Sequence, residues 1–133
     1  MNLFCSDKLI KQMDIAEAKS VFLILREIAR ALEMRTPPEA LRKYSNKAMK
    51  GTRNVWKFYT DKSNRIIWSY GRHLKGTRAE ESDDIFLLAY AGHDEQGRIA
   101  ADISRDVNRR NFFRVGTEGP KDGEGPGDSV RLT

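Results

Sequence analysis

Positively charged side chains are concentrated in the middle of this 133-residue sequence, where they suit one kind of chemistry. Between Ala40 and Ala79 there are eleven basic residues and one acidic residue, Asp61, so this segment has a formal charge of +10 and the rest of the chain −5. Cations at this density bind phosphate groups, because they replace the counterions that surround a nucleic acid. The basic residues are Arg42, Lys43, Lys47, Lys50, Arg53, Lys57, Lys62, Arg65, Arg72, Lys75 and Arg78.

Aromatic rings are interleaved with these cations, and nucleobases stack on such rings while neighbouring cations hold the phosphates. Trp56 and Trp68 also fit a place in the core, whereas Tyr59 and Tyr70 carry a polar tip and are better site candidates. A solvated lysine-rich face without a partner is the alternative, but charge segregation this strong is a poor way to gain solubility alone. The predicted RNA-binding residues are Arg42, Lys43, Lys47, Lys50, Arg53, Tyr59, Lys62, Tyr70 and Arg72.

Metal and cofactor chemistry find little support in the sequence. Two histidines and one cysteine, far apart in the chain, do not form a zinc site. Adjacent residues such as His93, Asp94 and Glu95 rarely converge on one ion. The sequence has no P-loop and no Gly-x-Gly-x-x-Gly motif, so we expect neither a metal nor a small-molecule cofactor.

Length and composition limit the class of protein. A chain of this size, with 39% hydrophobic and 32% charged residues, supports one domain with a modest core. A sequence pI of about 9.5 favours nucleic acid, ribosome or an anionic membrane as partner. The single cysteine, Cys5, permits no internal disulfide and indicates a reducing compartment. Without an apolar run of about 18 residues or a secretory signal, we expect a cytoplasmic protein that does not enter a membrane.

Helices are predicted before the basic segment. Residues 2–5 suit a short strand or an irregular lead-in, and Ser6 or Asp7 could cap a short helix over residues 8–13. From Ala18 to Leu32 the apolar residues follow the i, i+3, i+4, i+7 spacing of one helix face.

The boundaries of the predicted helices follow from capping residues and prolines. Asp14 and Glu17 have the spacing of a capping box, and Pro37 and Pro38 stop the long helix near Arg35. A second helix is predicted over residues 39–49, ended by Gly51.

The hydrophobic period then changes to two, which indicates strands. Residues 54–60 and 65–70 are rich in β-branched and aromatic residues, and the polar link 61–64 predicts an antiparallel hairpin. Residues 71–83 are expected to form an exposed loop. Residues 84–90 are nearly all apolar, as in a strand that is buried on both faces and central in its sheet.

The last part of the chain divides into a helix and a tail. Residues 94–110 suit a helix with Ile99, Ile103 and Val107 on one side, and Phe112 and Phe113 are expected to dock its end. Seven of the last 18 residues are Gly or Pro, so we expect one domain over residues 1–115 and a disordered tail over 116–133.

This order of elements predicts an α+β fold, with N-terminal helices packed on a small antiparallel meander sheet and a C-terminal helix. The long helix would cover one face of the sheet. The other face would stay partly open and is the expected place for a site.

Three features of the sequence resemble the sheet region of RelE/ParE-type toxin domains. Lys50-Gly51 leads into the strand Asn54-Val-Trp-Lys-Phe, and Asn64-Arg-Ile-Ile-Trp-Ser-Tyr is similar to a Tyr-Arg-apolar-apolar-Tyr strand of that family. The stretch from Ile85 to Glu95 is similar to family members whose last strand ends in a Gly/Asp-His-His-Asp-Glu sequence. The likeness covers residues 50–98 closely and 2–107 loosely.

The resemblance implies a small sheet packed on helices, with a concave basic face. Many members of the family cleave messenger RNA in the ribosome, where the 2′-hydroxyl attacks the adjacent phosphate and no metal is needed. Other members inhibit DNA gyrase without cutting nucleic acid. The expected partners are therefore RNA or the ribosome and an antitoxin protein that wraps the toxin.

The resemblance also implies catalytic positions, namely Lys57, Arg65, His93 and Arg98. The reaction needs a base, an acid and cations that stabilise the phosphorane, and a histidine titrates in the range that proton transfer requires. Alternatively, His93 is a satisfied residue at a strand end, and Arg65 forms a surface salt bridge to Asp61 or Asp84.

Three functions therefore remain open from the sequence. The first is a toxin-type endoribonuclease, and the second is a non-catalytic binder of gyrase, the ribosome or another protein, which the carboxylates of Asp94 and Glu95 favour mildly. The third is a nucleic-acid-binding module without a toxic role.

Overall fold

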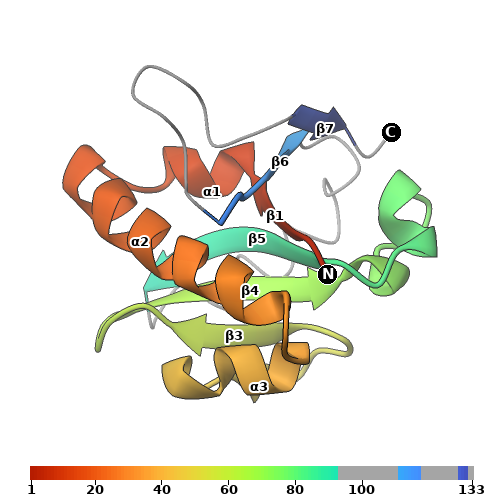
Figure 1. Cartoon of the computed structure of the whole chain (residues 1–133), viewed down its shortest axis with the longest axis horizontal. Helices are drawn as coiled ribbons and strands as arrows, with labels where there is room; N and C mark the ends of the chain where they lie inside the picture. Colours follow the sequence, from red (N-terminus) through yellow and green to blue (C-terminus); the bar gives the residue numbers. More distant parts are fainter. Residues whose placement is uncertain (93–110, 118–128, 132–133) are drawn as a thin grey trace.

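The computed structural model describes residues 1–92, 111–117 and 129–131 (Figure 1). The described strands all join one sheet, and most of the helical elements come between the first strand and the second. The helical elements are α1 (Asp7–Lys11), α2 (Ile15–Leu32), α3 (Pro37–Leu41) and the 3-10 turns η1 (Arg42–Tyr44), η2 (Gly71–His73) and η3 (Arg78–Glu81). The described strands are β1 (Leu3–Ser6), β2 (Lys47–Ala48), β3 (Trp56–Tyr59), β4 (Asn64–Tyr70), β5 (Ile85–Gly92), β6 (Asn111–Arg114) and β7 (Ser129–Arg131).

The described strands lie in the order β2-β3-β4-β5-β1-β6-β7 (Figure 1). The antiparallel meander β3-β4-β5 was predicted from the hydrophobic pattern and is confirmed. Strand β5 is in the middle of this order, and all of its residues except Gly92 are buried, which is also as predicted. A strand that is covered on both faces has no need of polar side chains on either of them.

The sheet extends beyond the predicted meander, and it is mixed rather than purely antiparallel. Strand β1 pairs in parallel with β5, and β6 pairs antiparallel with β1. Phe112 and Phe113 therefore belong to a strand, and Phe112 is fully buried there. The helix end that they were expected to dock lies outside the described residues. Within the tail that was expected to be disordered, Ser129–Arg131 pair with β6. The predicted helix over residues 94–110 lies outside the described residues.

Helix α2 begins and packs as its sequence predicts. The Asp14 side chain accepts a hydrogen bond from the Glu17 backbone at 2.7 Å, and the Glu17 side chain accepts one from the Asp14 backbone at 3.1 Å. This capping box satisfies two N–H groups that the first turn leaves unpaired. The buried side of α2, which includes Leu25 and Ile28, joins one core with Phe58 and other residues of β3 and β4.

The second helix is much shorter than the predicted 39–49. Helix α3 ends at Leu41, and after the turn η1 the backbone of Ser45 takes a left-handed conformation, with φ 56° and ψ 46°. A left-handed residue cannot continue a right-handed helix, so the chain changes direction there. Lys47 consequently lies on β2, at the edge of the sheet, and not on a helix.

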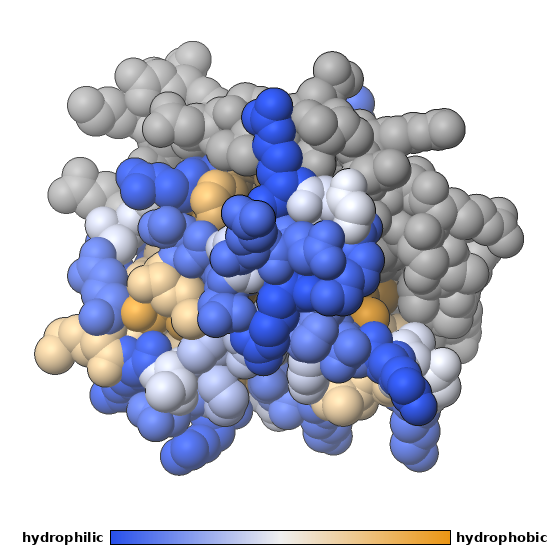
Figure 2. All heavy atoms as spheres, turned by 90° about the vertical axis from the view of Figure 1, so that its right-hand side faces the viewer, coloured by the Kyte–Doolittle hydropathy of each residue, from blue (hydrophilic) through white to orange (hydrophobic). Residues whose placement is uncertain are grey.

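The sheet face that points away from α2 is less open than predicted. Its residues on β4 and β5, among them Ile67, Leu88 and Ala91, belong to a second buried cluster. The segment 71–83, predicted as an exposed loop, contributes the buried Leu74 and Ala79 to that cluster. Figure 2 shows the end of the molecule where this segment lies, and the described residues there are mostly hydrophilic. At the β2–β3 edge of this face, Lys57 and Tyr59 remain partly exposed.

Candidate nucleic-acid interface

Three cations converge on the ring of Tyr59 at this edge. The guanidinium carbon of Arg65 lies 4.7 Å from the ring centroid, the Lys47 Nζ 5.8 Å and the Lys57 Nζ 6.0 Å. Each distance is within the range of a cation–π contact. Tyr59 and Lys57 are half-buried and Lys47 is exposed, so part of the group faces solvent.

Strand register explains why these four residues meet. Lys57 and Tyr59 are two positions apart on β3, so their side chains point to the same face. Lys47 is the partner of Lys57 across β2 and β3, and Arg65 is the partner of Tyr59 across β3 and β4. Directly opposed residues share a face, so cations from three strands surround one ring.

Arg65 differs from the two lysines in its burial. Only 3% of Arg65 is exposed, whereas sequence analysis placed it either on a phosphate or in a surface salt bridge. Hydrogen bonds from the Asn64 side chain, followed by backbone N–H groups and the charge of Arg65, hold the pKa of Asp61 below its usual range. Arg65 therefore contributes positive potential from beneath the surface and supports the Tyr59 ring.

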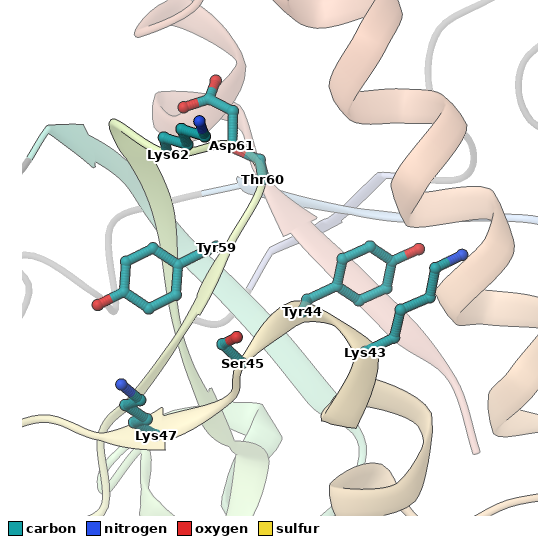
Figure 3. A pocket seen from close by; sticks show the side chains of 8 residues that line it. All are labelled: Lys43, Tyr44, Ser45, Lys47, Tyr59, Thr60, Asp61 and Lys62. Atoms are coloured by element: carbon teal, nitrogen blue, oxygen red, sulfur yellow. The ribbon is translucent and has the colours of Figure 1, made fainter.

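A pocket of about 540 Å³ opens beside Tyr59 (Figure 3). It lies between the turn η1, the strand β2 and the β3–β4 turn, and its walls include two tyrosine rings and three lysines. The lining residues are Lys43, Tyr44, Ser45, Lys47, Tyr59, Thr60, Asp61 and Lys62.

The side of the pocket nearest α2 is tied to that helix. Lys43 donates a hydrogen bond to Glu27 at 2.7 Å, and this ion pair lowers the pKa of Glu27. Burial, and then the nearby Glu27 carboxylate, raise the pKa of Tyr44 to about 12. Tyr44 therefore stays protonated at neutral pH, and the charge of Lys43 is largely compensated.

Two other predicted site residues lie on the opposite face of the sheet. Tyr70 packs edge-on against Trp56 and Trp68, and the guanidinium carbon of Arg72 lies 4.2 Å from its ring centroid. Trp68 is 1% exposed and donates a hydrogen bond to Asn46 at 2.9 Å, so it is a core residue. Tyr70 is an odd number of residues from Arg65 along β4, which is why the two point in opposite directions.

The remaining predicted residues are spread around these two groups. Arg42, Lys50 and Arg53 are exposed, on η1 and on the connection between β2 and β3. His93 and Arg98 lie outside the described residues. The structure thus brings together Lys47, Lys57, Tyr59 and Arg65, with Lys43 and Lys62 in the adjoining pocket.

Sequence analysis missed part of the pocket wall. Tyr44, Ser45 and Thr60 line the pocket but were not among the predicted site residues. A helix was expected through Ser45, and a helix there would not have paired Lys47 with Lys57 across two strands. No pattern in the sequence marks Ser45 as a left-handed residue, because serine adopts that conformation rarely.

Within the described ranges, no three His, Cys, Asp or Glu side chains gather in the manner of metal ligands. The helices described above are all too short or too polar to cross a bilayer.

Comparison of the chain with models of protein families, with curated proteins and with solved structures found no match in any of the three.

Proposed function

We propose that this chain is a RelE/ParE-like toxin-type domain of α+β class that binds RNA over Tyr59 and cleaves it without a metal. The observation that carries the proposal is the convergence of Lys47, Lys57 and Arg65 on one partly exposed aromatic ring. Rings stack on bases and cations neutralise phosphates, and this combination is typical of surfaces that hold single nucleic-acid strands.

The charges at this edge support binding of an anion. Lys47 and Lys57 are direct cross-strand partners, and like charges in that position destabilise a sheet. A phosphate bound at this edge would contact both side chains. We assign the phosphate contacts to the two lysines and the stacking contact to Tyr59, while the buried Arg65 positions the ring.

The proposed reaction uses the RNA's own 2′-hydroxyl. The 2′ oxygen bonds to the adjacent phosphorus while the bond from phosphorus to the 5′ oxygen breaks. A base takes the 2′ proton and an acid protonates the 5′ oxygen, which leaves a 2′,3′-cyclic phosphate and a 5′-hydroxyl. Lys57 and Arg98 stabilise the phosphorane, and His93 takes the 2′ proton and then gives it to the 5′ oxygen; the roles of His93 and Arg98 are assigned by resemblance to the family.

The structure also offers an observation in favour of a non-catalytic binder. Within the described residues, the histidine is His73, and it lies beside Trp56 and Tyr70, away from Tyr59. Cations without a proton donor or acceptor of suitable pKa bind phosphate but do not cleave it. The alternative function is therefore binding to gyrase, the ribosome or another protein through the same edge.

The proposal includes a cellular location and binding partners for the protein. We propose that it acts in the cytoplasm on RNA or on the ribosome, with an antitoxin as its protein partner. A segment rich in Asp and Glu is the kind of antitoxin that the Tyr59 edge would accept, because it would compete with phosphate for the same cations.

Expression in a bacterial host with mapping of RNA 5′ ends tests the proposal. Wild-type protein should arrest growth and produce new 5′-hydroxyl ends, and Lys57→Ala should suppress both effects. Lys11→Ala removes an exposed lysine on α1, away from the site, and should behave as wild type. Arrest without new ends would support the non-catalytic binder, and equal toxicity of Lys57→Ala and wild type would refute the site.

A further inference from the structure

The pocket beside Tyr59 has the size and lining of a nucleotide subsite. We propose that it holds one unpaired nucleotide of a single-stranded RNA, and that the strand then crosses Tyr59 toward Lys57. This inference rests on the proposed function only in taking RNA as the ligand, and it does not require cleavage. The pocket has a volume of about 540 Å³, which lies within the roughly 300–1,000 Å³ of typical small-ligand pockets.

Two lysines are available at the rim to hold a phosphate. Lys62 is exposed on the β3–β4 turn and, in the part of the chain that the structure describes, forms no ion pair. Lys47 approaches from β2 and rests over the Tyr59 ring. Lys43 forms an ion pair with Glu27, so Lys47 and Lys62 are the lysines that would bind a phosphate at the rim.

Among the described residues that line the pocket, Asp61 carries the single carboxylate, and this carboxylate is bonded within its own turn. Asp61 Oδ1 accepts hydrogen bonds from the backbone N–H groups of Ser63 and Asn64, at 2.7 and 2.8 Å, and the Asn64 side chain also donates to Asp61. Figure 3 shows this carboxylate pointing away from Tyr59 and Ser45. Asp61 thus fixes the turn that carries Lys62, and it does not meet an incoming phosphate.

Two aromatic rings border the pocket. The rings of Tyr44 and Tyr59 lie on opposite sides and point away from each other, with the Ser45 side chain between them, so a base would stack on the Tyr59 ring alone (Figure 3). Ser45 is exposed and held in a left-handed conformation, which turns its neighbours toward the pocket. A base in a duplex is paired and stacked, so only an unpaired base can enter such a space.

The pocket and the cation cluster form one continuous path. Tyr59 and Lys47 belong to both, and Lys57 lies directly opposite Lys47 across the sheet edge. Successive phosphates of one strand would meet Lys62 and Lys47 first and Lys57 next. The proposed ligand is therefore a single strand that runs over the β2–β3 edge.

Binding measurements with defined RNAs test this inference. The probes are a labelled 12-nucleotide polyuridine and a 12-base-pair RNA duplex, followed by fluorescence anisotropy at fixed salt. Wild-type protein should bind the single strand about tenfold more tightly than the duplex, since a base stack contributes roughly 1–3 kcal/mol. Lys62→Glu should weaken single-strand binding about tenfold, while Lys11→Glu, the same charge change on α1, should weaken it less than about twofold.

Each alternative result is decisive. Equal affinity for duplex and single strand, or equal loss for Lys62→Glu and Lys11→Glu, would overturn the subsite. Absence of binding to either RNA would overturn the subsite and the proposed function together. Lys62-dependent binding without any cleaved product would leave the subsite standing and refute only the nuclease. Because Lys62 is exposed on a turn, its substitution should leave the thermal unfolding midpoint unchanged, and that midpoint is measured alongside.

Discussion

The guanidinium of Arg65 lies against the ring of Tyr59, 4.7 Å from its centroid, and the two residues are direct partners across β3 and β4. The arginine is buried and the tyrosine is half-buried. One residue of the pair thus supplies charge and support from within, and the other presents a surface to solvent.

Replacement of Tyr59 should separate the contribution of its ring to RNA affinity from the contribution of its hydroxyl. Tyr59→Phe keeps the ring and should bind single-stranded RNA within about twofold of wild type. Tyr59→Leu loses the stacking surface and should bind about tenfold more weakly, since stacking contributes roughly 1–3 kcal/mol per base. Anisotropy titrations measure both affinities. Similar affinity of the Leu and Phe variants would show that no base stacks on Tyr59.

The two lysines should affect the salt dependence of binding. Each phosphate contact releases counterions, so Lys47→Ala and Lys57→Ala should each lower the slope of log K against log salt concentration by about 1. Lys11→Ala should leave the slope unchanged. Because Lys47 opposes Lys57 across the sheet, Lys47→Ala should keep or raise the free energy of unfolding while it weakens binding. A lysine variant with an unaltered slope would remove that residue from the interface.

Asp61 should give stability a defined dependence on pH. Its pKa in the folded protein is lowered from 3.8, first by the hydrogen bond from the Asn64 side chain. The folded state therefore favours the carboxylate, and this contribution is complete above the unfolded pKa and disappears as pH falls through the lower folded value. The free energies of unfolding of wild type and Asp61→Asn, measured in urea, should differ by a constant amount above about pH 5. This difference should shrink below pH 3.8. A difference that grows toward low pH would contradict this account.

Gly71 should tolerate no larger residue. It lies at the end of β4, where an added Cβ would overlap the Ala79 carbonyl oxygen and would come within 2.7 Å of the Ser82 carbonyl oxygen. Backbone atoms cannot move aside cheaply, so Gly71→Ala should cost about 1–3 kcal/mol of unfolding free energy. Gly116→Ala is the matched control, because no atom of the described residues lies within 4 Å of its added Cβ. Equal stability of the two variants in urea titrations would mean that the 71–83 segment packs differently.

Local patterns account for the parts of the fold that the sequence predicted. The apolar spacing of α2 and its capping residues depend on neighbours within one or two turns, and the β3-β4 hairpin joins residues that are close in sequence. The pairing of β1 with β5 joins residues more than 80 positions apart, as with Leu3 and Ile85. Strands of three or four residues leave no periodic signal that would reveal such a partner.

The site could be predicted only as far as strand register allows. Lys57, Tyr59 and Arg65 meet because alternation and hairpin pairing place them on one face, and all three were selected from the sequence. Lys47 was also selected, but on a helix that Ser45 ends. Tyr70 was grouped with them although alternation along β4 directs it to the other face.

Lysine acetylation in the presence and absence of RNA tests the central claim most directly. The protein is modified with a limiting reagent, alone and with saturating 12-nucleotide polyuridine, and the rate at each lysine is read by peptide mass spectrometry. The account predicts protection of Lys47, Lys57 and Lys62, with unchanged modification of Lys11. Unchanged rates at the first three lysines with RNA bound would contradict it.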